Sequence, residues 1–417
     1  MYLYTLIDNY RFFMQKSIWL FNPEHDMALA SYSVYYMIPN RINKMKSDLS
    51  ILPIWYVEEG EKSSFILCDE NNSHFFKEMQ KLFPQLQSTS ILYSLKGVFD
   101  SVFPWGWNPS LLYKIEHSDV SINKLPNYSE IDLLRNLSSR KSALDILSSF
   151  YKLEPIKSTI YENGDGAIAI SFNSTIDVNN FIQKYNDVIF KAPWSGSGRG
   201  IRRIVSTPSN SDIGWMERVL RTQKTLIGEP YYNKVVDFAM EFECKSGEVE
   251  FIGYSLFETD NQGAYKCNIL DSDDAIEKIV THYIPSSDLY KVKERLITLL
   301  QHFYASRYNG VLGVDMMICM KSDGYWLHPC VEVNLRMNMG IVAHRFYNRF
   351  ISPKSKGEYF VEHYFSNGEA LEFDIMMKER YPLIINNSLI ESGYLSLTVV
   401  NSDTQYQIYV VVSKRND

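Results

Sequence analysis

Short apolar runs alternate with turn signals and helical spacing along the first third of the chain. The run Ser17–Phe21 (SIWLF) ends at Asn22-Pro23, a dipeptide that is a strong turn signal. A second run, Ser64–Cys68, is followed by the helical spacing of His74–Leu82. This alternation predicts a small α/β domain over residues 14–125. The loop after its first strand would lie at the sheet edge where open α/β folds bind ligands.

The pattern then changes to two helices followed by a strand-rich region. Apolar residues recur at helical spacing between Ser129 and Leu153, and Ser139 or Ser142 is a candidate cap for the second helix. The segment Val188–Val205 (VIFKAPWSGSGRGIRRIV) reads as a strand, a glycine-rich loop and a second strand. Because it joins strand to strand and lacks the GxxxxGK[ST] pattern, it is neither a Rossmann turn nor a P-loop. It is either an ordinary hairpin loop or a loop whose backbone N–H groups approach phosphate oxygens.

A hairpin between residues 311 and 334 carries the most informative pattern. Two apolar strands flank Asp323-Gly324, the strongest short hairpin signal, which favours a two-residue loop. Extending that register places Asp315 directly opposite Glu332. Asn334 then lies on the same face and opposite Gly313, which has no side chain to fill the space.

Two carboxylates opposite each other in a β-ladder destabilise it unless something neutralises them. Asp315, Glu332 and Asn334 together offer hard oxygen ligands of the kind that magnesium prefers beside nucleotide phosphates. The alternative is an exposed sheet face on which the two carboxylates are only solvated. The strongly apolar flanks of both strands (VLGVDMMICM and WLHPCVEVN) favour the metal interpretation.

Composition narrows the class of partner. The chain has 417 residues, 45% of them hydrophobic, and a net charge of −7, so it is an ordinary globular protein without the basic balance of a nucleic-acid binder. No apolar run approaches the roughly 18 residues that span a bilayer. The five cysteines are scattered without a CxxC pair, which predicts free thiols and a cytoplasmic location.

Residues 130–345 resemble the ATP-grasp superfamily in the order of their motifs. The matching positions are Lys141 in a helical SSRKSALDIL stretch, Lys191 at a strand end, the glycine loop, Glu229 in TLIGEP, Asp237, Asp315 in Gly-Val-Asp, and Glu332, Asn334 and Arg336 in a Glu-x-Asn-x-Arg signature. The match at Asp237 is loose, and Leu335 replaces the proline that the family usually has there. This order is more specific than any single motif.

The resemblance implies an ATP site with Mg²⁺, or Mn²⁺, as its metal. The positions implied for nucleotide binding are Lys141, Lys191, Ser195, Gly196, Ser197, Gly198, Gly200, Glu229 and Asp237. Those implied for the metal are Asp315, Glu332 and Asn334. Arg336 would face the transferred group, and Lys266 would contact substrate or γ-phosphate, as a basic residue does in some of these ligases.

The implied fold is an ATP-grasp fold, of the α/β (α+β) class, preceded by a small α/β domain. The expected parts are an extension or start-site artefact (1–13), the N-terminal pre-ATP-grasp domain (14–125), a lid or central subdomain with the glycine loop (126–225), a C-terminal subdomain with the metal site (226–350) and an extension with a β-hairpin (351–417).

The implied activity is a ligase that activates a small-molecule or peptide carboxylate as an acyl phosphate, for attack by an amine, a thiol or a similar nucleophile. Two alternatives stay open: a kinase of the same fold and a non-catalytic nucleotide-binding protein. No nucleic-acid or membrane partner is expected, and the residues before 125 carry no recognisable substrate signature.

Overall fold

The first sheet is parallel and comes entirely from the N-terminal third of the chain. The computed structural model describes residues 15–57, 63–160, 169–195, 200–259 and 265–415. In spatial order the sheet comprises β3 (Thr89–Leu92), β2 (Ser63–Leu67), β1 (Lys16–Leu20), β4 (Lys96–Pro104) and β5 (Asp119–Lys124). Its helices are α1 (His25–Ser31), α2 (Asn40–Asp48), η2 (Leu52–Trp55), α3 (Asn72–Leu82), η3 (Pro84–Leu86) and α4 (Pro109–Glu116).

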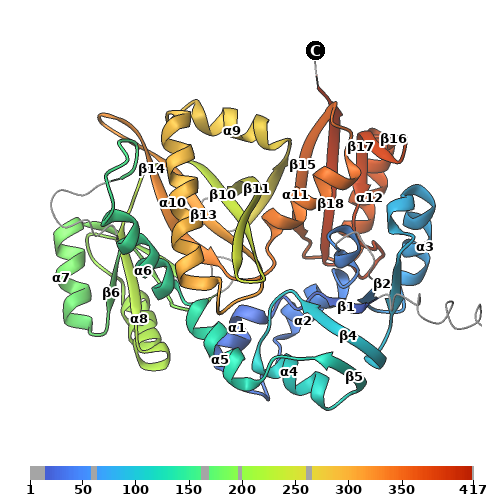
Figure 1. Cartoon of the computed structure of the whole chain (residues 1–417), viewed down its shortest axis with the longest axis horizontal. Helices are drawn as coiled ribbons and strands as arrows, with labels where there is room; N and C mark the ends of the chain where they lie inside the picture. Colours follow the sequence, from blue (N-terminus) through green and yellow to red (C-terminus); the bar gives the residue numbers. More distant parts are fainter. Residues whose placement is uncertain (1–14, 58–62, 161–168, 196–199, 260–264, 416–417) are drawn as a thin grey trace, which may run out of the picture.

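A small antiparallel sheet follows, which Figure 1 shows at one end of the molecule. Its strands, in spatial order, are β6 (Ile170–Phe172), β9 (Leu226–Pro230), β7 (Asp187–Lys191) and β8 (Ile201–Val205). The helices α7 (Thr175–Tyr185) and α8 (Asn210–Gln223) belong to it, and α5 (Tyr128–Leu137) and α6 (Arg140–Tyr151) precede it. Ser139 is the cap of α6, because its side chain accepts a hydrogen bond from the Lys141 N–H. We call this four-stranded sheet with α7 and α8 the lid.

The third sheet is antiparallel and has nine strands. In spatial order they are β14 (Gly324–Asn334), β13 (Gly310–Lys321), β10 (Lys234–Lys245), β11 (Glu248–Thr259), β12 (Tyr265–Leu270), β15 (Ser355–His363), β18 (Tyr406–Lys414), β17 (Leu389–Ser396) and β16 (Ile384–Asn386). Its helices are α9 (Asp273–Thr281), α10 (Ser286–Tyr304), α11 (Met339–Phe350) and α12 (Glu369–Arg380). The predicted C-terminal hairpin is therefore a continuation of this sheet. The predicted α/β fold class is confirmed, with one parallel and two antiparallel sheets.

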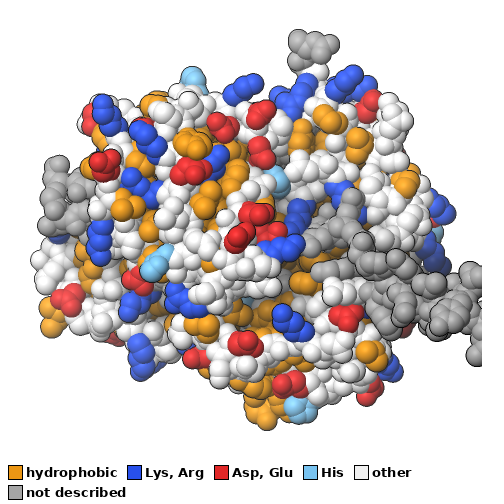
Figure 2. All heavy atoms as spheres, in the orientation of Figure 1, with side chains coloured by type: hydrophobic (Ala, Val, Ile, Leu, Met, Phe, Trp, Pro, Cys, Tyr) orange, Lys and Arg blue, Asp and Glu red, His pale blue; other side chains and the backbone are white. Residues whose placement is uncertain are grey.

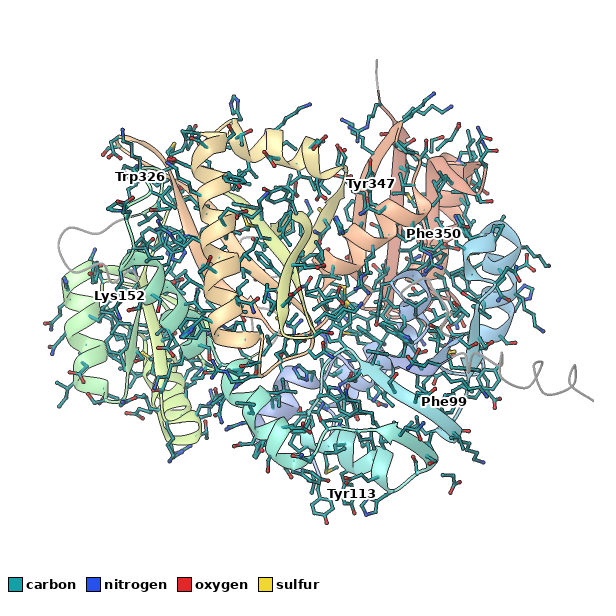
Figure 3. All side chains as sticks on the ribbon, viewed as in Figure 1. Phe99, Tyr113, Lys152, Trp326, Tyr347 and Phe350 are labelled. Atoms are coloured by element: carbon teal, nitrogen blue, oxygen red, sulfur yellow. The ribbon has the colours of Figure 1, made fainter. Side chains whose placement is uncertain are left out.

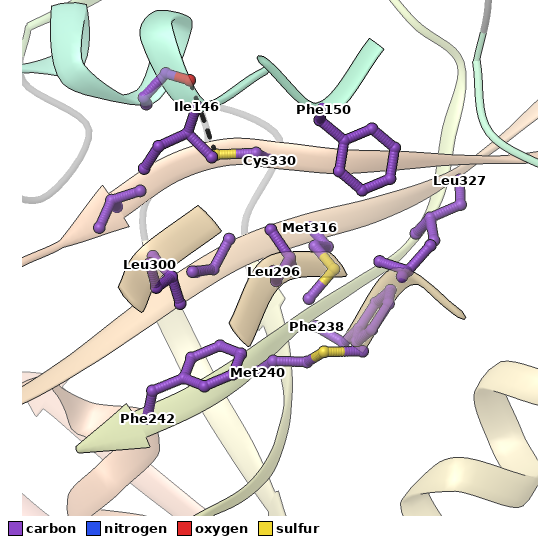
Figure 4. Packing of buried hydrophobic residues seen from close by; sticks show 14 of the residues in the cluster. Ile146, Phe150, Phe238, Met240, Phe242, Leu296, Leu300, Met316, Leu327 and Cys330 are labelled. Carbon is purple, nitrogen blue, oxygen red and sulfur yellow. Dashed lines mark hydrogen bonds between the residues drawn. The ribbon is translucent and has the colours of Figure 1, made fainter. Parts of the chain in front are cut away.

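One face of β10, β13 and β14 builds the main core. Successive residues of a strand point to opposite faces, so alternate apolar residues share one side. Figure 4 shows this face packed against α6 and α10, with Cys330 donating a weak hydrogen bond of 3.9 Å to the carbonyl of Ala143. The buried residues labelled there are Ile146, Phe150, Phe238, Met240, Phe242, Leu296, Leu300, Met316, Leu327 and Cys330. Burial of this face leaves the opposite face of the same strands available for polar side chains.

A second core joins the parallel sheet to the C-terminal third of the chain. Trp55 is fully buried, and its ring centroid lies 5.7 Å from that of Phe83, 5.5 Å from Phe346 and 5.1 Å from Phe350. Its indole N–H donates a 2.7 Å hydrogen bond to the carbonyl of Leu397. Figure 3 shows Phe350 on α11, beside the parallel-sheet unit. The residues beyond 350 are thus part of the core that fixes the N-terminal sheet in place.

Charged side chains are interspersed on the surface. Figure 2 shows Lys and Arg mixed with Asp and Glu over one face, with no continuous basic area among the coloured residues. Within the described residues, no helix is both long and apolar enough to cross a membrane.

Replacing Trp55 with alanine should lower the free energy of unfolding by about 3–5 kcal/mol, because it empties a fully buried aromatic site and removes a hydrogen bond. Urea unfolding followed by circular dichroism measures this. Trp326→Ala, at a half-buried position near the tip of the β13–β14 hairpin, is the matched control and should cost about 1 kcal/mol or less. Equal losses in the two variants would contradict the role given to Trp55.

Candidate functional site

The site face of the nine-stranded sheet is the face opposite the main core. Alternation along β10, β13 and β14 brings polar residues together on this face. They are Asp237, Glu241, Asp315, His328, Glu332 and Asn334. The lid lies at one end of this face, and the parallel sheet approaches its other end (Figure 1).

The β13–β14 hairpin has the predicted pairing at Asp315 but a different loop from the one predicted. Lys321 pairs with Gly324, so the loop is Ser322-Asp323, one residue earlier than predicted. Gly324 adopts a φ of 132°, which is open to glycine and costly for other residues. Continued unchanged, this pairing would not bring Asp315 opposite Glu332.

A bulge at Pro329 restores that register. Asp315 pairs with Glu332 and Met317 pairs with His328, so β14 advances four residues while β13 advances two. Proline has no N–H for the ladder and occurs in sheets at edges or bulges, and β14 is an edge strand. The predicted juxtaposition of Asp315 and Glu332 is therefore confirmed, although the predicted loop position was wrong.

The two carboxylates form an electrostatically costly pair. Burial and the facing Glu332 raise the pKa of Asp315 to about 7. The Asn334 amide donates a 2.9 Å hydrogen bond to Asp315 Oδ2 and only partly offsets this cost. All three side chains are half-buried, so each keeps some exposed surface.

Arg140 is the cation that the structure places against this pair. Its guanidinium lies 2.9 Å from Glu332 and also donates to the carbonyl of Ala192 (2.7 Å) and to Ser195 Oγ (2.6 Å). The side chain is buried, whereas the predicted Lys141 is exposed one residue further along α6. Among the described residues, no contact joins Lys141 to the site. A signal for Arg140 was present in the sequence, since it directly follows the Ser139 cap, but both cations lie in the same first turn.

Lys191 and Glu229 form a buried ion pair in the lid. Lys191 ends β7, Glu229 lies on the neighbouring β9, and Lys191 Nζ is 2.5 Å from Glu229 Oε1. Both side chains are almost fully buried. The structure thus brings together two residues implied for nucleotide binding, one for phosphate and one for the adenine side.

The ends of the glycine loop are anchored on both sides. Ala192 donates its N–H to the carbonyl of Gly200, and a Cβ at Gly200 would collide with the Ser195 hydroxyl, so only glycine fits there. Trp194 exchanges two hydrogen bonds with the amide side chain of Gln223 on α8. The three remaining loop positions of the prediction, Gly196, Ser197 and Gly198, lie outside the described residues.

Arg336 connects this site to the parallel sheet. Its guanidinium makes two hydrogen bonds to the Asp26 carboxylate, of 3.1 and 2.9 Å, and one of 3.0 Å to the carbonyl of Met337. Burial opposes ionisation of Asp26, but Arg336 outweighs it and lowers the pKa of Asp26. The Met337 N–H in turn donates to the carbonyl of Trp105. The first turn of α1 and the segment after β4 are thus held against the end of β14.

A cavity of about 200 Å³ lies beside this ion pair. Its wall includes Arg336, Leu335, His25 and aromatic rings such as Trp105. Burial lowers the pKa of His25 to about 4, so its imidazole is neutral at pH 7. The cavity is at the carboxyl edge of the parallel sheet, the position at which open α/β folds bind ligands.

Two other predicted residues have partners of their own. Asp237 accepts hydrogen bonds from Lys234 and from Thr259 Oγ1, at 2.9 Å for the latter. It shares the site face with Asp315, so its ribose role stays a prediction. Lys266 is mostly exposed and pairs with the exposed Glu258 at 2.9 Å, so the structure does not bring it into the site.

Glu241 is a buried carboxyl that the sequence did not reveal. It accepts a 2.9 Å hydrogen bond from Asn338, the residue that caps α11. A Cβ at Gly313 or at Gly340 would collide with its carboxylate, so both glycines make room for it. Burial, with Asp315 nearby, raises the pKa of Glu241 to about 8. At neutral pH this group therefore holds a proton. Its hydrogen bond with Asn338 holds the end of the loop between β14 and α11.

The chemistry of the donors fits a divalent cation. Among the described residues no cluster of three or more His, Cys, Asp and Glu side chains is arranged for a metal. Asp315 and Glu332 with the amide of Asn334 provide two carboxylates and one neutral oxygen, the set that Mg²⁺ uses when phosphates complete its shell. The raised pKa of Asp315 marks a site at which added positive charge is stabilising.

Comparison with known proteins finds similarity at the level of structure. No protein-family model and no curated protein matches the sequence. N5-carboxyaminoimidazole synthetase from Staphylococcus aureus, complexed with ADP, is 12% identical, with 96% of this chain and 93% of that chain covered and a TM-score of 0.48. A biotin carboxylase from Campylobacter jejuni in a β,γ-ATP complex is 12% identical, covering 96% and 88%, with a TM-score of 0.48.

A third match is the biotin carboxylase domain of 2-oxoglutarate carboxylase from Hydrogenobacter thermophilus, in complex with MgADP and bicarbonate. It is 10% identical, with 96% and 86% of the two chains covered and a TM-score of 0.49. At these identities and TM-scores the similarities carry no argument about activity. The function of this chain therefore has to be inferred from its own residues.

The protonated state of Glu241 predicts a pH-dependent stability. Between the unfolded pKa of about 4.5 and the folded value of about 8, the unfolded state releases the proton that the folded state retains. The wild type should therefore lose stability relative to Glu241→Gln as the pH rises through this window, by roughly 4 kcal/mol. Urea unfolding at pH 5 and pH 8.5 tests this. A difference between the two proteins that does not change with pH would show that Glu241 is not held protonated.

Proposed function

We propose that this chain is an ATP-grasp ligase that uses Mg-ATP to activate a carboxylate as an acyl phosphate, which an amine or similar nucleophile then attacks. The observation that carries the proposal is the row Asp315, Glu332 and Asn334, in which Glu332 pairs with Arg140. The lid adds a second buried cation, Lys191. Two facing carboxylates repel each other and destabilise the ladder. A cation bound together with the nucleotide would neutralise that repulsion.

The lid and the sheet have separate tasks in this scheme. Lys191 and Arg140 supply positive charge for the phosphates, and the loop anchored at Ser195 and Gly200 lies beside them. The Glu229 end of β9 faces the nucleoside. A bound Mg²⁺, held by the carboxylate row, would neutralise charge on the β- and γ-phosphates. Such catalysis consists of positioning and electrostatic stabilisation and requires no Ser or Cys nucleophile.

The acceptor end of the reaction lies at Arg336. Arg336 lines the 200 Å³ cavity at the edge of the parallel sheet and follows Asn334 by two residues along the chain. A carboxylate bound in that cavity would meet Arg336 where the γ-phosphoryl group is transferred, and the guanidinium would stabilise the charge that develops on the acyl phosphate. The neutral His25 in the cavity wall can donate or accept one hydrogen bond to the substrate. The Asp26 partner fixes the orientation of Arg336.

The first test is binding. ADP with Mg²⁺ at a hundred times its dissociation constant should stabilise the folded protein by about 2.7 kcal/mol and raise the melting temperature by several degrees. Asp315→Asn should lose the part of this shift that depends on Mg²⁺. Lys414→Ala, an exposed pair partner of Glu391 on the outer part of the sheet, should keep the whole shift. No shift in the wild type, together with no heat in titration calorimetry, would remove the basis of the proposal.

The second test identifies the products. With a carboxylate and a nucleophile that it accepts, the enzyme should release ADP and inorganic phosphate, because the positive charge and the carboxylate row lie where a γ-phosphoryl group leaves. Phosphorus NMR of the products distinguishes the outcomes. AMP with pyrophosphate would contradict the mechanism, whereas ADP with a stable phosphorylated product would indicate the kinase alternative.

A further inference from the structure

His328 is a buried histidine without a hydrogen-bond partner among the described residues. Only 1% of its surface is exposed, and neither ring nitrogen has a partner. Leaving a buried polar group unpaired costs roughly 1–3 kcal/mol, and native proteins pair most such groups. A ligand group that formed a hydrogen bond with His328 would remove this cost.

The register of the hairpin places His328 on the site face. It pairs with Met317, and Met317 pairs with Asp237 on its other side, so the three form a row across β14, β13 and β10. Met317 is two residues from Asp315, about 7 Å along the strand. The His328 row therefore lies next to the Asp315–Glu332 pair along the sheet. Asn334 lies on the other side of that pair.

The surroundings of His328 lie at and beside the lid. The ring of Tyr232, just after the lid strand β9, lies 5.7 Å from the imidazole in an edge-to-face arrangement. Lys191 is near enough for its charge to act on the imidazole. Burial, reinforced by Lys191, lowers the pKa of His328 to about 3, so the ring is neutral at every physiological pH.

We propose that His328 reads the base of the bound nucleotide, by a hydrogen bond to the amino and ring-nitrogen edge of adenine. The inference rests on the proposed function, since it assumes that a nucleotide occupies this cleft. A neutral imidazole has one unprotonated ring nitrogen, which can accept a hydrogen bond from the 6-amino group of adenine. Phosphate oxygens need donors and positive charge, and Lys191 and Arg140 already supply both. The order of the rows, with the metal ligands at the phosphate end, leaves the His328 row for the nucleoside.

The experiment compares ADP with the diphosphate of purine riboside, in which a hydrogen atom replaces the 6-amino group. Titration calorimetry with Mg²⁺ should show that the wild type binds ADP about tenfold more tightly, the worth of one hydrogen bond. His328→Phe should bind the two nucleotides with equal affinity, while its affinity for inorganic tripolyphosphate stays that of the wild type. Cys330→Ala, on the core face of the same strand, is the matched control and should keep the tenfold preference.

The outcomes separate this inference from the proposed function. If the wild type binds neither nucleotide, the proposed function fails. If it binds both nucleotides equally, or if His328→Phe keeps the preference, the base-reading role is overturned and the proposed function stands. Equal weakening of ADP and tripolyphosphate in His328→Phe would also overturn it, because His328 would then act on phosphate. Should the Phe variant fail to fold, His328→Met replaces it, with the same expected and contradicting results.

Discussion

The opposition of Asp315 and Glu332 is the constraint around which the site is organised. Two carboxylates facing each other in a half-buried ladder repel, and the repulsion appears as the raised pKa of Asp315. Arg140 balances the pair from one side, through Glu332. Breaking a buried or half-buried ion pair by removing one partner leaves an uncompensated charge, so Arg140 and Glu332 depend on each other for stability as well as for position. Glu332 is consequently more than a solvated surface group in the metal-free protein.

The same constraint explains the local departures from regular structure. The edge position of β14 and the bulge at Pro329 set the register that brings the carboxylates together. Gly313 leaves space that the buried Glu241 fills, and Glu241 holds Asn338, the cap of α11. The loop between β14 and α11 carries Arg336 and is thereby fixed at both ends. A change at any of these positions would affect the position of Arg336 without contacting it.

The sequence predicts those parts of the site that follow from local patterns, and it does not predict those that tertiary packing decides. The facing carboxylates could be predicted because alternation and hairpin register are local properties, although the loop was misplaced by one residue and the bulge compensated for the error. Arg140 could not be separated from Lys141, because adjacent helix positions differ only in the direction they face, which tertiary packing decides. Lys266 lies near a register shift in the β11–β12 pairing. No local sequence pattern predicts this shift, so the position of Lys266 could not be predicted either. The core that joins Trp55 to α11 depends on contacts between residues about 290 positions apart, beyond the reach of periodicity.

On the proposed function, the buried Lys191–Glu229 pair limits how a nucleotide can bind. Both charged groups are buried and therefore desolvated, which costs free energy. Their mutual attraction offsets much of this desolvation cost only while they stay paired. On the proposed function, a phosphate can take a share of Lys191 without breaking the pair, because an ammonium has three N–H donors and Glu229 uses few of them. Lys191 therefore need not leave Glu229 for the phosphate to bind. A lysine already fixed in position loses little side-chain entropy when the nucleotide arrives, which favours tight and specific binding over rapid exchange.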